Sequence, residues 1–201
     1  CYGVFSVINA FAAIGLNILT GYCGQVSLGT GGFMAVGAFA TYKIMTMFPD
    51  LNIMIIVLMS GVITAFVGIL FGLPSLRIKG FYLAVATLAS QFFIIWLFNK
   101  VPWFYNYSDT GQITVSERTM FGVAVTGANA PSYATYLFCL ILVVVLGFAA
   151  KNMIRSKIGR SWMAIRDMDI AAEIIGVPPL RTKLSAFAIS SFYIGIAGSL
   201  Y

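Results

Sequence analysis

The stretch "GLNILTGYCGQVSLGTGGF", from Gly15 to Phe33, decides how this chain is organised. It holds six glycines, several hydroxyl side chains and one glutamine, and it carries no charge. The residues on both sides of it are apolar enough to cross a lipid bilayer. The stretch is therefore either a short turn between two membrane helices or an interruption within the membrane itself.

Composition places the whole chain in a membrane. Of its 201 residues, 60% are hydrophobic and 9% are charged, whereas about a quarter of the residues in soluble domains are charged. So few charges cannot cover a water-facing surface. We therefore expect an all-α, polytopic bundle of transmembrane helices. The apolar segments are Tyr2–Leu19, Phe33–Phe48, Asn52–Gly72, Phe81–Asn99, Tyr133–Ala150 and a last one that begins near Leu184.

The residue inventory argues against several kinds of chemistry. The chain has no histidine and its three cysteines are scattered, so we expect neither a metal site nor catalytic residues. It has no Walker motif and no GxGxxG spacing, which excludes a nucleotide-binding loop as the role of the glycine-rich stretch. The formal charge of +6 comes from lysines and arginines at the ends of apolar segments, which indicates membrane orientation and not binding to nucleic acid.

The distribution of these basic residues orients the helices. Residues 151–183 carry seven lysines and arginines, so the positive-inside rule places this segment in the cytoplasm. Counting back, Lys100–Pro131 lies outside, the turn with Arg77 and Lys79 lies inside, and Pro49–Leu51 lies outside.

Within the opening stretch, we interpret Thr20–Gly32 as a broken or re-entrant membrane segment. The alternative is a plain cytoplasmic turn, but the stretch is uncharged where the other inside turns are basic, and the helix after it is short. Unwound backbone at membrane depth is either buried in protein or lines a cavity, and such interruptions are typical of transporter binding sites. A helix that begins near Gly31 would direct free N–H groups into the gap. We assign the substrate pathway to Gly21, Gly24, Gln25, Ser27, Gly29, Thr30 and Gly31.

The cytoplasmic segment contains a predicted amphipathic helix. Its apolar stripe consists of Ile158, Trp162, Ile165, Met168, Ala172 and Ile175. Arg166, Asp169 and Glu173 lie beside the stripe, with Arg166 and Asp169 at the i, i+3 spacing of an ion pair. Gly176 and Pro178–Pro179 end the helix. An interfacial helix on the inner leaflet would have a broad basic face, so the mixed charge favours docking into a groove on a partner protein.

Small residues predict close packing between helices. Ser191, Gly195 and Ser199 recur every four positions, and Gly68 and Gly72 form a GxxxG pattern. Both patterns let helix backbones approach closely. They are frequent in membrane helices of every function, so they predict a bundle and indicate nothing about a substrate.

Three stretches together resemble one known family. They are "GLNILTGYCGQVSLGTGGFMAVGAFA", "GLPSLRIKGFYLAVATLA" and "GRSWMAIRDMDIAAEIIGVPPLRTKLSAFAISSFYIGIAGSLY". They are similar to permease subunits of ABC importers for branched-chain amino acids, of the LivH/LivM type, and more to the LivM branch. The cytoplasmic segment also resembles the "EAA…G" coupling loop of ABC permeases. Ala171, Ala172 and Gly176 keep that spacing, and Ile170 stands at the glutamate position.

The resemblance implies a role and a set of partners. Residues 1–201 would form one membrane permease domain, incomplete at both ends because Cys1 and Tyr201 lie in or beside apolar runs. Residues 151–183 would be its coupling segment, in which Arg166, Asp169, Ala171, Ala172, Glu173 and Gly176 transmit ATPase closure. The partners would be a second permease subunit, two cytoplasmic ATPases and an external solute-binding protein, in the lipid of a bacterial inner membrane. This chain would need no cofactor, since ATP is hydrolysed by the partner subunits, and it would not be an enzyme.

Three other functions stay open from the sequence. A urea or short-amide permease of the same family would use the neutral groups of Gln25, Ser27 and Thr30 equally well. An ion-coupled carrier or channel usually has ionisable residues within the membrane, and these spans have almost none. A cofactor-holding subunit of a membrane enzyme is disfavoured by the absence of histidine and of a cysteine cluster.

Overall fold

The computed structural model describes residues 2–75, 81–104, 118–120, 123–126 and 131–201. The elements are α1 (Tyr2–Asn17), the π-helix η1 (Ile18–Tyr22), α2 (Thr30–Met47), α3 (Ile53–Ser75), α4 (Phe81–Lys100), β1 (Arg118–Met120), β2 (Val123–Thr126), α5 (Ser132–Arg155), α6 (Lys157–Asp167), α7 (Asp169–Ile174) and α8 (Pro179–Leu200). The predicted helical, polytopic bundle is confirmed. The short antiparallel pair β1–β2 was not predicted.

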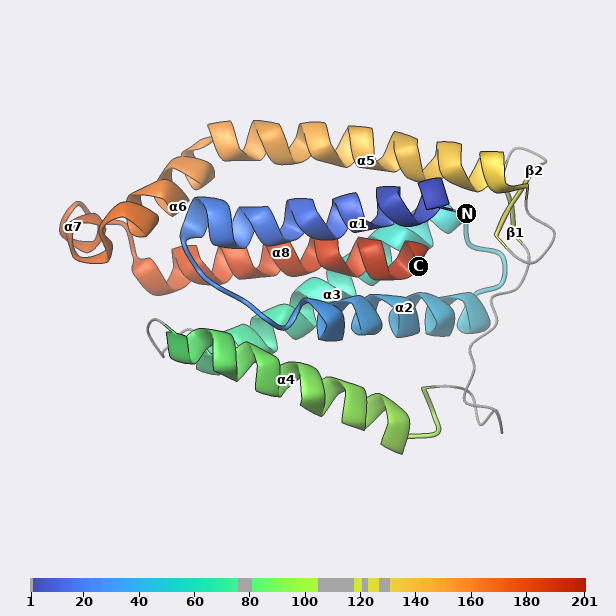
Figure 1. Cartoon of the computed structure of the whole chain (residues 1–201), viewed down its shortest axis with the longest axis horizontal. Coiled ribbons are helices and arrows are strands. Elements are labelled where there is room, and N and C mark those ends of the chain that lie inside the picture. The colour runs from blue at the N-terminus through green and yellow to red at the C-terminus, as the bar shows by residue number, and fades with distance from the viewer. Residues whose placement is uncertain (1, 76–80, 105–117, 121–122, 127–130) are drawn as a thin grey trace.

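The long helices run between the same two ends of the molecule (Figure 1). α6 and α7 lie at one end, together with the last turn of α3 and the first turn of α4. The first residues of α1, the turn between α2 and α3, the β1–β2 pair and the last residues of α8 lie at the other end. This alternation agrees with the orientation read from the basic residues. Arg77, Lys79 and most of Lys100–Pro131 lie outside the described residues.

Five helical stretches in the described part of the chain are long and apolar enough to cross a membrane. They are Tyr2–Tyr22, Ile53–Pro74, Tyr82–Lys100, Ser132–Arg155 and Pro179–Leu200. The remaining apolar segment of the sequence, Phe33–Phe48, corresponds to α2, which has 18 residues and is not among the five. Glycines, three threonines and Lys43 make α2 more polar than its neighbours, and α2 is the helix that follows the interruption.

α8 is the most enclosed helix, and glycine lets its neighbours reach it. A Cβ atom added to Gly195 of α8 would overlap the Thr64 side chain of α3, and one added to Gly37 of α2 would overlap the Gly195 backbone. A Cβ added to Gly68 of α3 would overlap Ser191. The predicted close approach at Gly68, Ser191 and Gly195 is therefore observed. Because lipid is as apolar as the side chains, such van der Waals contact holds membrane helices together where a hydrophobic driving force cannot.

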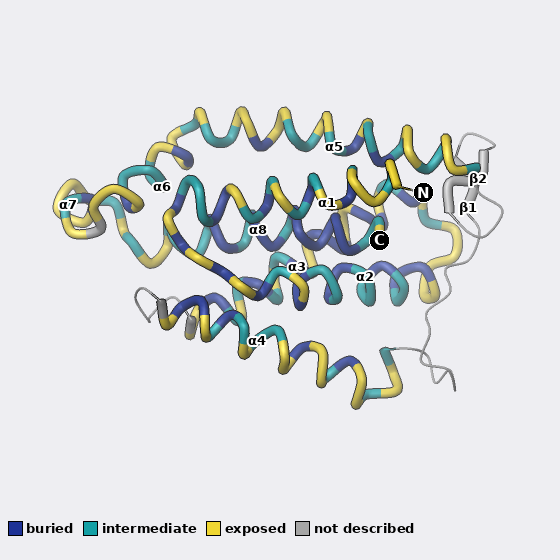
Figure 2. Tube along the Cα trace, viewed as in Figure 1, coloured by how far each residue is buried: buried dark blue, intermediate teal, exposed yellow. Residues whose placement is uncertain are grey.

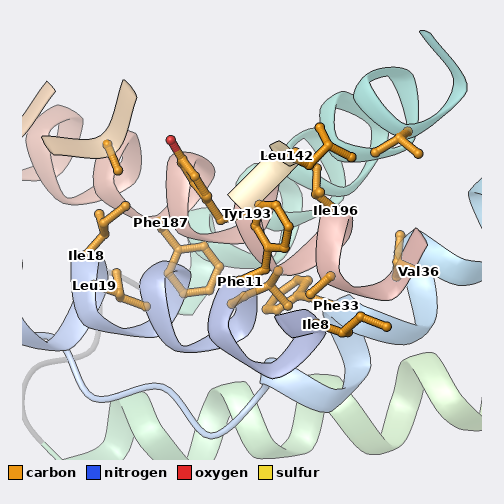
Figure 3. Packing of buried hydrophobic residues seen from close by; sticks show 14 of the residues in the cluster. Ile8, Phe11, Ile18, Leu19, Phe33, Val36, Leu142, Phe187, Tyr193 and Ile196 are labelled. Carbon is orange, nitrogen blue, oxygen red and sulfur yellow. The ribbon is translucent and has the colours of Figure 1, made fainter. Parts of the chain in front are cut away.

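Aromatic rings fill the space between α1, α2 and α8. Phe11, Phe33, Phe187 and Tyr193 lie together in the buried cluster (Figure 3). Phe33 of α2 and Phe187 of α8 meet edge to face, with ring centroids 5.6 Å apart and planes at 83°. This is a favourable aromatic geometry. It fixes the first turn of α2 against the middle of α8.

A few hydrogen bonds cross between helices. The Ser60 hydroxyl of α3 donates to the Gly37 carbonyl of α2 at 2.9 Å, and the Tyr193 hydroxyl of α8 donates to the Leu146 carbonyl of α5 at 2.8 Å. Exposed residues follow the outer edges of α4 and α5 (Figure 2). The inner helices α1, α2, α3 and α8 thus form a packed unit that α4 and α5 flank.

Candidate functional site

The glycine-rich stretch is an interruption between two helices. α1 continues into the π-helix η1 and ends near Cys23, residues 24–29 are non-helical, and α2 begins at Thr30. In Figure 1 this linker returns from the end of α1 into the bundle, where α2 starts. The predicted break is therefore present. Its helix begins one residue before the expected Gly31.

The end of the break lies well inside the bundle. The first turn of α2 packs on α4, because Cβ atoms added to Gly31 and Gly32 would lie 3.3 and 3.0 Å from Gln91. Gln91 is close to the midpoint of α4, which runs from Phe81 to Lys100. At 1.5 Å per residue, that point is about 15 Å from either end of α4. A plain turn at the rim of the bundle would not reach this level.

The linker alternates in burial along its length. Cys23, Gln25, Ser27 and Gly29 are buried, whereas Val26 and Leu28 are 56% and 49% exposed. A period of two is the signature of extended backbone. The alternation is the reverse of the usual one for a protein in water, since the polar side chains point inward and the apolar ones point outward. Neutral polar groups are thereby collected inside the bundle.

A hydroxyl on α4 holds the middle of the linker. The Leu28 N–H donates to Thr87 Oγ1 at 3.0 Å, and Thr87 Oγ1 in turn donates to the Ala84 carbonyl at 2.9 Å. Gly29 lies against the Thr87 carbonyl, where an added Cβ would be 2.9 Å away. Close approach of the two backbones therefore requires glycine at position 29.

Gln25 brings an unsatisfied acceptor into the interior. The residue is 6% exposed, and its Oε1 atom has no hydrogen-bond partner among the described residues. Its backbone N–H is satisfied by the Leu19 carbonyl at 3.1 Å. A buried acceptor without a partner costs about 1–3 kcal/mol, so such an atom calls for an explanation. A solute that donates a hydrogen bond would supply one.

The N-terminus of α2 provides donors at the same break. Its cap, Gly29, has no side chain to bond the first N–H groups, and the first intrahelical bond runs from the Phe33 N–H to the Gly29 carbonyl. The earlier N–H groups of the turn have no partner within the helix. Together with the positive end of the helix dipole, they suit a carboxylate or another electron-rich group.

The structure brings part of the predicted pathway and part of the predicted coupling segment together. Arg166 of α6 donates from Nη1 to the Gly21 carbonyl of η1 at 2.7 Å. Gly24 has φ +69°, and a Cβ added there would lie 2.8 Å from Arg166 Cγ. Arg166 also pairs with Asp167, with Nε and Oδ1 3.2 Å apart. The expected partner Asp169 has no described side chain.

The single amphipathic helix predicted for the coupling segment is wrong. The chain is extended at Met168, with φ −154° and ψ 102°, and this residue separates α6 from α7. Trp162 and Ile165 are buried as expected, but Met168 and Ile175 are 69% and 79% exposed. The break resets the helical phase, so a stripe that is continuous in sequence is not continuous in space.

The remaining coupling residues lie on or after α7. Ala172 is buried, Ala171 is half-buried and Glu173 is exposed. Gly176 ends the helix as predicted, with φ +91°, since the Gly176 and Val177 N–H groups donate to the Glu173 and Ala172 carbonyls at 3.0 Å. This pair of bonds is a Schellman motif. The extended residue Met168 separates Glu173, on α7, from Arg166, which belongs to α6.

Two residues that contact the break were missed from the sequence. Thr87 and Gln91 of α4 lie four positions apart and therefore on one face of the helix. Polar residues at this spacing inside an apolar span are a usable signal. The length and the lack of charge of α4 predicted a membrane span but gave no role to this polar pair.

Comparison with known proteins agrees with this arrangement. A family model described as "Branched-chain amino acid transport system / permease component" matches residues 3–201. The chain belongs to this family. It is 31% identical to the high-affinity branched-chain amino acid transport system permease protein LivM of Salmonella typhimurium LT2 and of Escherichia coli K12, over 98% of this chain and 50% of each relative.

A more distant relative in the comparison is the probable ABC transporter permease protein y4mJ of Sinorhizobium fredii, 27% identical over 88% of this chain and 49% of its own length. This branched-chain permease family member thus spans about half the length of the curated relatives it matches. No solved structure matches it.

Proposed function

We propose that this chain is a transmembrane permease subunit of an ABC importer that moves branched-chain or related amino acids across the bacterial inner membrane. The observation that carries the proposal is the interruption at residues 24–29, which turns Gln25 and Ser27 inward and ends at mid-bundle, in a member of this permease family. Irregular backbone with neutral polar groups inside a bundle is typical of a solute path.

The chemistry of the break suits a zwitterion. An amino acid carries a carboxylate that accepts hydrogen bonds and an ammonium group that donates them. The N–H groups at the start of α2 are donors, and Gln25 Oε1 is an acceptor without a protein partner. Neither of these two groups is ionised, which suits a solute of zero net charge. The pathway in this proposal consists of Gly21, Gly24, Gln25, Ser27, Gly29, Thr30 and Gly31.

Alternating access in this proposal is driven by ATP hydrolysed on other subunits. The partners are a second permease subunit, two cytoplasmic ATPases and an external solute-binding protein. α7 supports this arrangement because Met168, Ile170, Ile174 and Ile175 are all at least two-thirds exposed at the end of the bundle that the basic residues assign to the cytoplasm. In our proposal the segment 151–183 transmits ATPase closure to the bundle.

Uptake by the complete importer tests the function directly. Proteoliposomes that contain this chain with its partner subunits should accumulate labelled leucine only when ATP is supplied. Transport that persists without the ATPase subunits would contradict the proposal and favour an ion-coupled carrier.

Gln25 tests the site within that assay. The change Gln25→Leu should raise the KM for leucine about tenfold, since a hydrogen bond to a charged group contributes about 1.5 kcal/mol. Val26→Leu is the matched control because Val26 is the exposed neighbour. An unchanged KM for Gln25→Leu would remove Gln25 from the pathway.

A permease for urea or a short amide is the second candidate. It is favoured by the same neutral groups, because an amide needs one acceptor and one donor and no ion pair. Competition against labelled leucine separates the two. Excess isoleucine should abolish uptake and excess urea should leave it unchanged, whereas uptake of labelled urea that excess leucine does not reduce would establish the alternative.

A further inference from the structure

The coupling segment and the interrupted segment meet at one side chain. Arg166 is in the last turn of α6, and Gly21 is in the last turn of η1, 145 residues earlier in the chain. Arg166 Nη1 donates to the Gly21 carbonyl at 2.7 Å. This is a short, charge-assisted hydrogen bond, the stronger kind in proteins.

The Arg166 guanidinium lies at the C-terminal end of η1, where a positive charge is favourable. The last carbonyls of a helix have no N–H partner within it and form the negative end of the helix dipole. Gly21 supplies such a carbonyl, and the Arg166 guanidinium satisfies it. The π-helical turn at Ile18–Tyr22 adds to this, because π-turns are rare and are frequent at functional sites.

Gly24 accommodates the Arg166 side chain on the linker side of that helix end. A Cβ added to Gly24 would lie 2.8 Å from Arg166 Cγ and 3.5 Å from Arg166 Cβ. Gly24 also has φ +69°, a conformation that L side chains rarely adopt. Arg166 therefore contacts the chain both before and after it leaves the helix.

α6 itself is anchored to the rigid part of the bundle. Trp162 is fully buried, and its Nε1–H donates to Ser185 Oγ of α8 at 3.0 Å. Arg166 lies one helical turn beyond Trp162, close to the extended residue Met168 where α6 ends. A movement of α7 would therefore reach Arg166 before it reached the α6–α8 contact.

We propose that Arg166 is a positioning residue that ties the cytoplasmic segment to the interrupted segment. It fixes the end of η1 and the start of the linker, so that displacement of α6 and α7 moves residues 24–29. The transport role of this link rests on the proposed function. Its structural role, which is to hold the end of η1 in place, does not.

The experiment uses the complete importer in lipid nanodiscs and proteoliposomes with three variants. Arg166→Gln removes the cation, Arg166→Lys keeps the charge without the forked guanidinium, and Arg160→Gln is the control on an exposed residue of the same helix. Amide hydrogen exchange of peptides spanning residues 18–26 reports the position of the helix end. The Gln25 amide, bonded to the Leu19 carbonyl, is its reference point. Uptake per ATP hydrolysed reports coupling.

In Arg166→Gln, exchange at Tyr22–Gln25 should rise at least about threefold as the helix end opens. Uptake per ATP should fall at least about fivefold while ATP hydrolysis continues, the lower end of the range for coupled sites. Arg166→Lys should restore part of both, and Arg160→Gln should match the wild type. A purely structural lesion would lower assembly and ATP hydrolysis together and leave uptake per ATP unchanged.

The structural role of Arg166 at the end of η1 and its role in transport are tested by different measurements. Unchanged exchange in Arg166→Gln overturns the positioning role, whatever happens to transport. Raised exchange with unchanged uptake per ATP overturns the link between the two segments. The absence of ATP-dependent uptake by the wild-type importer would contradict the proposed function. Amide hydrogen exchange would in that case still show whether Arg166 holds the end of η1.

Discussion

The α3–α8 contact and the linker between η1 and α2 both depend on glycine, for opposite reasons. At the α3–α8 contact, Gly68 and Gly195 remove side chains so that two regular helices interlock over their length. In the linker, Gly24 and Gly29 let an irregular chain pass close to Arg166 and Thr87. The first use makes a continuous packed surface, and the second makes a few separate contacts.

The difference indicates which part of the molecule can move. Interlocked helices shift only as a unit, because many atom pairs separate at once. The linker and the helix end before it are held by single hydrogen bonds, such as those of the Leu28 N–H and the Gly21 carbonyl, each of which contributes about 1–2 kcal/mol. Local opening is therefore expected at the linker long before it is expected at α8.

The largest effect is expected at the packed surface. Gly195→Ala would place a methyl group onto the Cβ and both γ atoms of Thr64, so it should destabilise the subunit by about 3 kcal/mol. Gly147→Ala in α5 is the control, since among the described residues of other elements its added Cβ would meet, within 4 Å, only Ile14 Cδ1 at 4.0 Å. Thermal unfolding in detergent measures both. Equal melting temperatures for the two variants would contradict the packed-surface interpretation.

A smaller effect separates backbone strain from crowding in the linker. Gly24→Ala and Gly176→Ala both place alanine at a positive φ, which costs about 1–2 kcal/mol. Only Gly24 has a neighbour within 4 Å, Arg166. Gly24→Ala should therefore be more destabilising and should also lower uptake.

The double variant Gly24→Ala with Arg166→Ala isolates the crowding between these two residues. Because the Arg166 side chain is absent, the added methyl group should cost less than it does in the wild-type background, and the cycle should show coupling of about 0.5 kcal/mol or more. Strict additivity in thermal unfolding would show that the backbone conformation alone accounts for Gly24.

The Thr87 contact should have a moderate effect. Thr87→Val preserves the shape of the side chain and removes the acceptor of the Leu28 N–H, at a cost of about 1 kcal/mol. Amide exchange at Leu28 should rise, and uptake should fall with it. Ser90→Ala is the control because the Ser90 hydroxyl donates to the Ala86 carbonyl of its own helix and not to the linker. Unchanged exchange at Leu28 would remove Thr87 as the anchor.

The smallest effect is expected at the opposite end of the bundle. Lys43 Nζ lies 4.2 Å from the centroid of the Trp103 ring, which connects α2 to the segment after α4. Trp103→Leu should cost about 0.5–1 kcal/mol, as for an exposed cation–π pair. Lys43→Met in the same background should add little further. Full additivity of the two changes in thermal unfolding would show that the pair does not interact.

The features that depend on local composition could be predicted from the sequence. The features that depend on contacts between distant residues could not. Apolar length located the helices, the uncharged glycine run located the break, and Gly176 before Pro178–Pro179 located the end of α7. The bend at Met168 was missed because helical spacing continues through it, and nothing local marks where a helix changes direction. The partner of Arg166 was missed because Gly21 is 145 residues away.

The assignment of individual residues to transport remains a prediction, since no comparison tests it. Gln25 and Ser27 were chosen as polar residues in a glycine-rich break, and the structure turns both inward. Thr87 and Gln91, which contact that break, follow from the packing of α4 and not from the composition of the break itself. Residues of α4 that contact the linker can be recognised in the sequence only once the two segments are known to pack together.

Because inward and outward side chains alternate along the linker, the number of its residues decides which of them point inward. Gln25 and Ser27 point inward and Val26 and Leu28 point outward because burial repeats every two residues between Gly24 and Gly29. Adding or removing one residue would exchange the two faces, exposing the amide and the hydroxyl and burying the valine and leucine. Adding or removing two would restore them. The number of residues in this segment is thus more tightly constrained than the identity of any one of its outward-facing side chains.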